Sequence, residues 1–332
     1  MLPRAATEFY ALQQRVNAAA AAEVGRLWRK MGDDFDSSWR RIGPAALDVL
    51  VAAQSEVARA ALDYVPSVLA ETNLADRPAG SPRLHAFVGR ASDGRSLETL
   101  AFGAVTTAKS AIADGANTSA ALQNGGDWLD LMTKLQVADT ARQVVGVMTA
   151  SRKTLSGTVR VLNPPSCQRC AILAGRFYRW STGFQRHPRC DCVNLPAANA
   201  GWARSEGFLT DPMDAYRRGE IRDLTGAQRF AIDNGADITR VVNATRGMST
   251  TATDRSLSAR KIHLAEKKAK FEAAAEAQRQ ASISSGMPDL MAQFSHLPRA
   301  NSTRILTPEG IYQQARTRDE AIELLRHWGY LT

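Results

Sequence analysis

Thiol and imidazole side chains are concentrated in one short segment of this 332-residue chain. All four cysteines lie between Cys167 and Cys192, as a Cys-x2-Cys pair followed by a Cys-x-Cys pair, and a histidine precedes the second pair. A Cys-x2-Cys turn directs two thiolates at one ion, and a second pair from a facing strand completes the tetrahedron that Zn²⁺ prefers. The spacing therefore predicts a zinc site, with five candidate ligands for four positions: Cys167, Cys170, His187, Cys190 and Cys192.

Other chemistries use the same residue types. Disulfides between facing strands would form in an oxidising compartment, and a Cys–His pair would serve as a nucleophile and its base. A catalytic pair also needs a third group that orients the imidazole, whereas clustered thiols are typical of shared ligands or bridges. A thiol oxidoreductase would need a βαβ context around Cys-x-x-Cys that this sequence lacks. His187, which precedes Pro188, has a structural alternative as part of the turn into the last strand.

The net positive charge of the chain surrounds the cysteines. Lys plus Arg exceeds Asp plus Glu by 42 − 33 = 9, and positions 140–190 carry nine cations and no carboxylate. Such a segment offsets the charge of a thiolate–zinc site and attracts phosphates without reading base sequence. The candidate DNA contacts are Arg160, Arg169, Arg176, Arg179, Arg186 and Arg189.

Length and composition indicate a folded protein with two domains or one large one. Hydrophobic residues make up 44% and charged residues 23%, which excludes disordered and fibrous classes. The first residues lack the apolar segment of a secretory signal, and no run approaches the roughly 18 apolar residues of a membrane span. We therefore expect a soluble protein that is made in the cytoplasm.

Helices are expected to position the cysteine segment. Before it, apolar residues recur every three or four positions, which predicts amphipathic helices packed as a bundle. One helix is predicted to begin at Gly43-Pro44 and to stop at Pro66, and a long one to follow the Gly125-Gly126 break and reach about residue 150. The other predicted helices are 8–31, a short one from Ser81, and 97–115.

The cysteine segment itself is predicted to be a small β unit, with strands at 158–162, 175–180 and 187–196. After it, Thr225-x-x-Gln228 and Thr317-x-x-Glu320 are capping boxes that open short helices, 256–282 is a charged helix, and Gly329 is a C-terminal cap. The predicted fold class is α+β, mostly α. It comprises a helical domain (1–150), a Cys/His module with following helices (151–255) and a C-terminal helical tail (256–332).

The cysteine segment resembles a known family. The run Cys167-x2-Cys170-Ala-Ile-Leu-Ala-Gly175, an aromatic strand, and His187-Pro-Arg-Cys190-Asp-Cys192 with a closing Pro196 is similar to the MuF-like minor head proteins of tailed bacteriophages. This resemblance covers 159–196, and 224–248 is similar to the segment that follows in actinobacterial phages and prophages.

The resemblance implies a role in head morphogenesis and no catalysis. It implies location in the virion, with the portal protein and the capsid or scaffold proteins as partners, packaged DNA as a non-specific contact, and no membrane. The alternative from another class is a zinc-dependent nucleic-acid-binding protein or nuclease, which the basic segment favours. A nuclease of the His-Asn-His type needs a further catalytic histidine, and the basic segment contains only His187.

Overall fold

The chain forms two compact units. The computed structural model describes residues 2–74, 76–162, 166–182, 192–247 and 306–332. Unit 1 comprises Met1–Leu224 with Arg304–Thr332, and unit 2 comprises Thr225–Thr303. Most of the described chain is helical and a small antiparallel sheet accompanies the helices, which confirms the predicted α+β, mostly α class. No helix in the described ranges is long and apolar enough to cross a bilayer.

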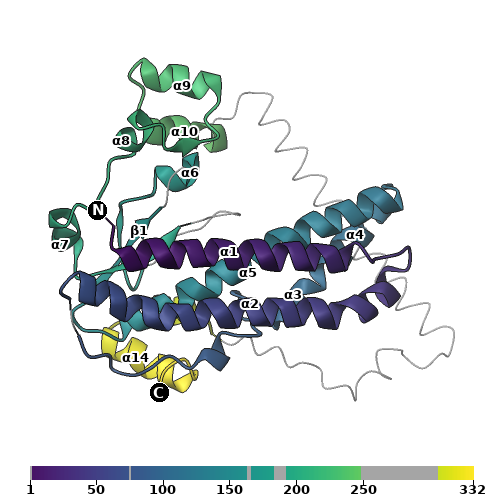
Figure 1. Cartoon of the computed structure of the whole chain (residues 1–332), viewed down its shortest axis with the longest axis horizontal. Helices are drawn as coiled ribbons and strands as arrows, with labels where there is room; N and C mark the ends of the chain where they lie inside the picture. The colour runs from purple at the N-terminus through teal and green to yellow at the C-terminus, as the bar shows by residue number, and fades with distance from the viewer. Residues whose placement is uncertain (1, 75, 163–165, 183–191, 248–305) are drawn as a thin grey trace. The chain divides into compact units, whose positions relative to one another are not determined.

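Three long helices lie side by side in unit 1 (Figure 1) and confirm the predicted bundle. They are α1 (Arg4–Trp28), α2 (Phe35–Glu71) and α5 (Thr118–Ala150). Between α2 and α5 the chain forms a 3₁₀ turn η1 (Leu84–Ala86) where a helix from Ser81 was expected. The expected helix 97–115 is divided at Phe102 into α3 (Leu97–Ala101) and α4 (Gly103–Ala113).

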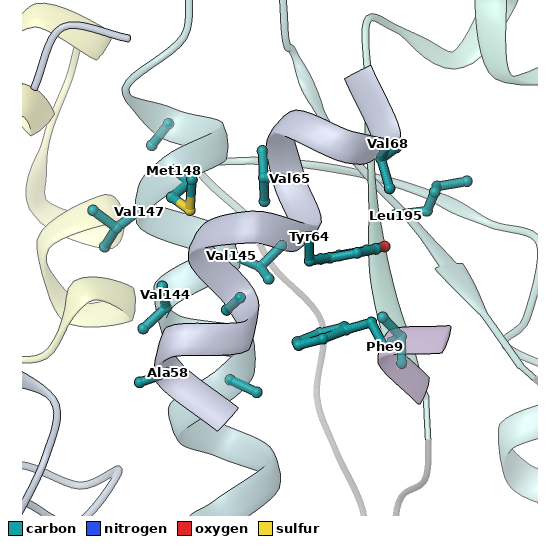
Figure 2. Packing of buried hydrophobic residues seen from close by; sticks show 14 of the residues in the cluster. Phe9, Ala58, Tyr64, Val65, Val68, Val144, Val145, Val147, Met148 and Leu195 are labelled. Atoms are coloured by element: carbon teal, nitrogen blue, oxygen red, sulfur yellow. The ribbon is translucent and has the colours of Figure 1, made fainter. Parts of the chain in front are cut away.

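The core of the bundle joins the helices to the β sheet. In Figure 2, the ring of Phe9 from α1 stacks on Tyr64 from α2, with 4.3 Å between ring centroids. Leu195 from the strand β4 (Val193–Ala197) belongs to the same buried cluster. The Tyr64 hydroxyl donates to the carbonyl of Asn194 at 3.0 Å, and complete burial raises the pKa of Tyr64. The sheet is thus fixed to α2 through both apolar packing and a buried hydrogen bond.

Helix α2 passes through both prolines that were expected to bound it. The helix begins after Asp34, whose carboxylate accepts from the Ser37 N–H at 3.0 Å. Beyond Pro66 the buried residues Val68 and Leu69 continue the apolar face. The predicted ends of this helix are wrong, because that packing outweighs the roughly 3 kcal/mol that proline costs inside a helix.

Helix α5 continues through Gly125-Gly126, so the predicted break is wrong. The helix begins after Asn117, whose side chain accepts from the Ala120 N–H at 2.9 Å. A Cβ atom at Gly125 would lie 2.6 Å from Cζ2 of Trp28, and one at Gly126 would lie 2.9 Å from its Cδ1. The two glycines therefore admit the Trp28 indole against the backbone of α5 and do not interrupt the helix.

The predicted β unit forms a three-stranded antiparallel sheet. Strand β1 (Gly157–Val161) lies between β3 (Phe177–Arg179) and β4. A two-stranded parallel pair joins β2 (Ser166–Cys167) to β5 (Ile221–Arg222). Short helices follow β2 and β4: α6 (Gln168–Ala171), α7 (Ala200–Ser205) and α8 (Pro212–Arg217). The first two predicted strands are confirmed, and the described part of the third is β4.

The C-terminal helices of unit 1 return to the bundle. Helices α13 (Pro308–Gln314) and α14 (Arg318–His327) both contact α5. The Arg318 guanidinium donates to the carbonyls of Arg152 and Leu155 and lies 5.5 Å from the ring centroid of Trp180. Gly329 has φ +77° and ends α14, which confirms its predicted role as a cap.

The described part of unit 2 is a pair of helices, α9 (Gly226–Asp233) and α10 (Ile238–Gly247). The predicted capping box is confirmed, because the side chains of Thr225 and Gln228 each accept from the other's backbone N–H. The predicted helix 256–282 lies outside the described residues. The boundaries of the compact units, Leu224 and Arg304, differ from those predicted at 150 and 255, because the sheet and the C-terminal helices pack on the bundle.

Candidate metal centre

The structure brings three of the four cysteines together. Cys167 ends β2, Cys170 lies in α6, and Cys192 precedes β4. Cys170 and Cys192 are both 0% exposed and pack as one cluster, with the partly buried Cys167 and Leu162 against them. No disulfide joins the three to one another. We refer to Cys167, Cys170 and Cys192 as the thiol cluster.

The backbone around Cys167 explains how the first pair is held. Cys167 is the N-cap residue of α6, and its Sγ accepts from the Cys170 N–H at 3.4 Å. After α6, Gly175 turns with φ +64°, and a Cβ atom there would lie 2.3 Å from the Thr210 nitrogen. The Gly175 N–H then donates to the Arg160 carbonyl at 2.8 Å. The Cys-x2-Cys turn is therefore tied at its exit to the central strand of the sheet.

Arg160 is buried in the centre of the sheet and faces the thiol cluster. Its side chain is among the largest that are fully buried, and its Nη2 donates to the Cys170 Sγ at 3.4 Å. A guanidinium that is removed from solvent cannot contact DNA phosphates. The sequence-based interpretation of Arg160 as a DNA contact is therefore wrong in this structure.

Another buried arginine, Arg142, contacts the backbone of the cluster. Arg142 from α5 donates through Nε to the Cys192 carbonyl at 3.3 Å and through Nη1 to Asp139 Oδ1 at 2.8 Å. Sequence reasoning counted Arg142 as part of the basic segment and missed this contact. No local signal distinguishes it, because the contact joins a helix to a residue fifty positions later, just before β4.

The other arginines that were predicted to contact DNA differ in how far their side chains are exposed to solvent. Arg176 and Arg179 are exposed beside and within the edge strand β3, and Arg169 on α6 is half-buried. Arg186 and Arg189 lie outside the described residues. Within the described chain, the candidate phosphate contacts are therefore confined to Arg169, Arg176 and Arg179.

The donor chemistry of the thiol cluster fits zinc, since thiolates are soft ligands for that ion. Within the described ranges, no three or more His, Cys, Asp or Glu side chains are arranged to hold a metal. The candidates that would complete a set, His187 and Cys190, lie outside those ranges. The three described thiols therefore pack together without forming a metal site by themselves, and a zinc site would require at least one of the other two residues.

A half-open hollow of about 390 Å³ adjoins the cluster. It shares Arg160 and Leu162 with the surroundings of the thiols, and Phe208 adds an apolar wall. At its rim Arg218 donates to Glu220 through Nε at 2.8 Å, and this hydrogen bond lowers the pKa of the Glu220 carboxyl. None of the three cysteines of the thiol cluster lines this hollow.

Comparison of the chain with family models, curated proteins and solved structures found no match. The resemblance to MuF-like proteins thus remains a prediction from the cysteine motif.

Proposed function

We propose that this protein is a minor head protein of a tailed bacteriophage, which associates with the portal and the inner head and acts in head morphogenesis. The observation that supports the proposal is the convergence of Cys167, Cys170 and Cys192 in one buried cluster. These residues carry the resemblance to MuF-like proteins, and their convergence indicates that the motif serves one local centre. The portal protein and the capsid or scaffold proteins are the proposed partners.

In this proposal the thiol cluster is a structural zinc site. Cys167, Cys170 and Cys192 would hold the ion together with Cys190 or His187. The ion would supply a cross-link between the turn at α6 and the strand β4, which are distant in sequence. Such a link stabilises a segment whose own apolar core is small.

The test is to quantify this chain in DNA-filled heads purified from the producing strain. Mass spectrometry would give its amount relative to the major capsid protein, and an abundant host cytoplasmic protein would measure contamination. We expect a few copies per head, well above the contamination level. Complete absence from filled heads would contradict location in the virion and leave a factor that acts only during assembly, or the nucleic-acid enzyme.

A second candidate function, non-specific DNA contact, is favoured by the exposed Arg176 and Arg179 on one edge of the sheet. Two exposed guanidinium groups without neighbouring carboxylates in the sequence segment attract phosphates. This function is compatible with a head protein, which resides beside packaged DNA. It is also the part of the nucleic-acid-binding alternative that the described residues favour.

A further inference from the structure

We infer that strand β3 is the docking site for an extended acidic segment of a partner protein, which adds a strand to the sheet. The inference rests on the proposed function, because it states how the portal protein or a capsid or scaffold protein is held. It uses backbone groups of the sheet that neither the cysteine motif nor the DNA contact uses.

Strand β3 is an edge of the sheet, and among the described strands it pairs with β1 alone. The Arg176 carbonyl and the Trp180 N–H each form a backbone hydrogen bond of 3.1 Å on the β1 side. Backbone groups of successive residues in a strand point to opposite sides. Those of Phe177 and Arg179 therefore point away from β1.

Three of these outward groups have no hydrogen-bond partner among the described residues. They are the N–H and the carbonyl of Phe177 and the N–H of Arg179. The Arg179 carbonyl accepts from the Thr182 N–H at 3.1 Å, which ends the open edge there. An edge of this kind is a template for another extended chain, whose peptide groups continue the ladder of hydrogen bonds.

The opposite edge of the sheet, strand β4, is closed. By the same alternation, Asn194 and Pro196 point their backbone groups away from β1. The Asn194 carbonyl accepts from the Tyr64 hydroxyl at 3.0 Å, and proline has no N–H to donate. Within the described chain, a further strand can therefore join the sheet at β3 and not at β4.

Charge determines which kind of segment fits. Arg176 and Arg179 are exposed beside and within β3, and neither forms an ion pair in the described chain. A second copy of this chain would bring the same arginines together, and like charges on paired strands destabilise the pair. Duplex DNA would satisfy the charges but has no peptide groups for the open edge. An extended protein segment that carries Asp or Glu satisfies both.

The experiment applies the full-length protein to an array of short overlapping peptides that cover the portal, capsid and scaffold proteins of the producing phage. Affinities of the peptides that bind are then measured in solution by fluorescence anisotropy. Arg179→Ala removes the charge and retains the outward N–H, whereas Arg179→Pro removes both. The matched control is Arg15→Ala, at an exposed position of α1. Circular dichroism and thermal unfolding verify that each variant is folded.

N-methylated forms of the peptide that binds most tightly give a test that needs no variant protein. A paired strand directs alternate N–H groups to its neighbour. Methylation of one alternate set of N–H groups should therefore abolish binding, and methylation of the other set should leave it unchanged. If Arg179→Pro is unfolded, these two sets decide the question alone.

We expect acidic peptides to bind and Arg15→Ala to match the unaltered protein. Arg179→Ala should weaken binding about threefold, as expected for an exposed ion pair. Arg179→Pro should weaken it at least about threefold more, as expected for one net hydrogen bond.

Equal affinities of Arg179→Pro and Arg179→Ala, or equal effects of the two methylated sets, would show attraction by charge alone and overturn the inference. Binding of none of the peptides would overturn it as well. The proposed function is tested separately by the amount of this chain in filled heads, so its failure and that of the inference are distinguishable.

Discussion

The helical bundle and the thiol cluster, both in unit 1, differ in the side chains that fill their interiors. The bundle buries long rows of aliphatic and aromatic residues, including Phe9, Tyr64 and Val145. The thiol cluster has Cys170 and Cys192 at its centre, with little besides Leu162 around them. A large apolar interior stabilises a fold by burial alone, whereas a small one needs a covalent or metal cross-link. We therefore expect the two regions to respond to different perturbations.

The largest expected effect comes from removing thiols. The double variant Cys167→Ser, Cys170→Ser should unfold the segment around α6, because serine hydroxyls are poor zinc ligands and binding of the metal is coupled to folding. The helices should stay folded, since their core contains neither residue. Limited proteolysis with mass mapping would locate cleavage at 166–182, while circular dichroism would report the helices. Unchanged protease resistance of that segment would contradict the proposed cross-link.

A core substitution in the bundle should have the opposite pattern. Phe9 is 5% exposed and stacks on Tyr64, so Phe9→Ala should lower the free energy of unfolding by about 3–5 kcal/mol. Chemical denaturation followed by circular dichroism measures this loss. A chelator should not increase this loss of stability, because Phe9 and the cysteines belong to separate buried clusters. A loss that grows with chelator would show that the bundle and the thiol cluster fold as one unit.

Two glycines test whether the close approach of Trp28 stabilises the bundle. Alanine inside a helix is favoured over glycine by about 1 kcal/mol. At Gly25 of α1 a Cβ atom would meet only the Arg29 side chain at 4.0 Å, so Gly25→Ala should stabilise the protein by up to that amount. At Gly125 the same change places a Cβ atom 2.6 Å from the Trp28 ring and 2.7 Å from the Ala104 carbonyl. Gly125→Ala should therefore destabilise the protein by about 1–3 kcal/mol.

The opposite signs of these two shifts, measured by thermal or chemical unfolding, are the result to look for. Stabilisation by both substitutions would mean that α5 moves away from Trp28 at little cost.

Local signals predicted much of the fold. The capping box at Thr225 and Gln228 and the strand at 158–162 depend on neighbours in sequence, and the structure confirms both. The role of Gly125 depends on Trp28, almost a hundred positions away. The rule that a glycine pair interrupts a helix considers only neighbours in sequence and cannot include that contact. Similarly, the positive charge of Arg160 suggested a surface role. Arg160 lies between Val159 and Val161, which are both buried, and this apolar context was the sequence feature that indicated a buried position.

The smallest expected effect concerns the exposed arginines of the sheet, which contribute to neither interior. A plot of log affinity against log salt has a negative slope. If Arg176 and Arg179 contact phosphates, Arg176→Ala with Arg179→Ala should reduce the magnitude of this slope by roughly two, about 0.9 per lost contact. The matched control is Arg15→Ala with Arg59→Ala, which removes the same charge from exposed positions of α1 and α2.

Binding of duplexes of unrelated sequence, measured by fluorescence anisotropy over a salt series, gives the slope. Equal slopes for the two double variants would assign DNA attraction to net charge and not to the edge of the sheet. A smaller salt dependence for Arg176→Ala with Arg179→Ala alone would instead give the sheet two functions. Its interior contacts the Cys170 thiol through the buried Arg160, and its exposed edge would contact phosphates through Arg176 and Arg179.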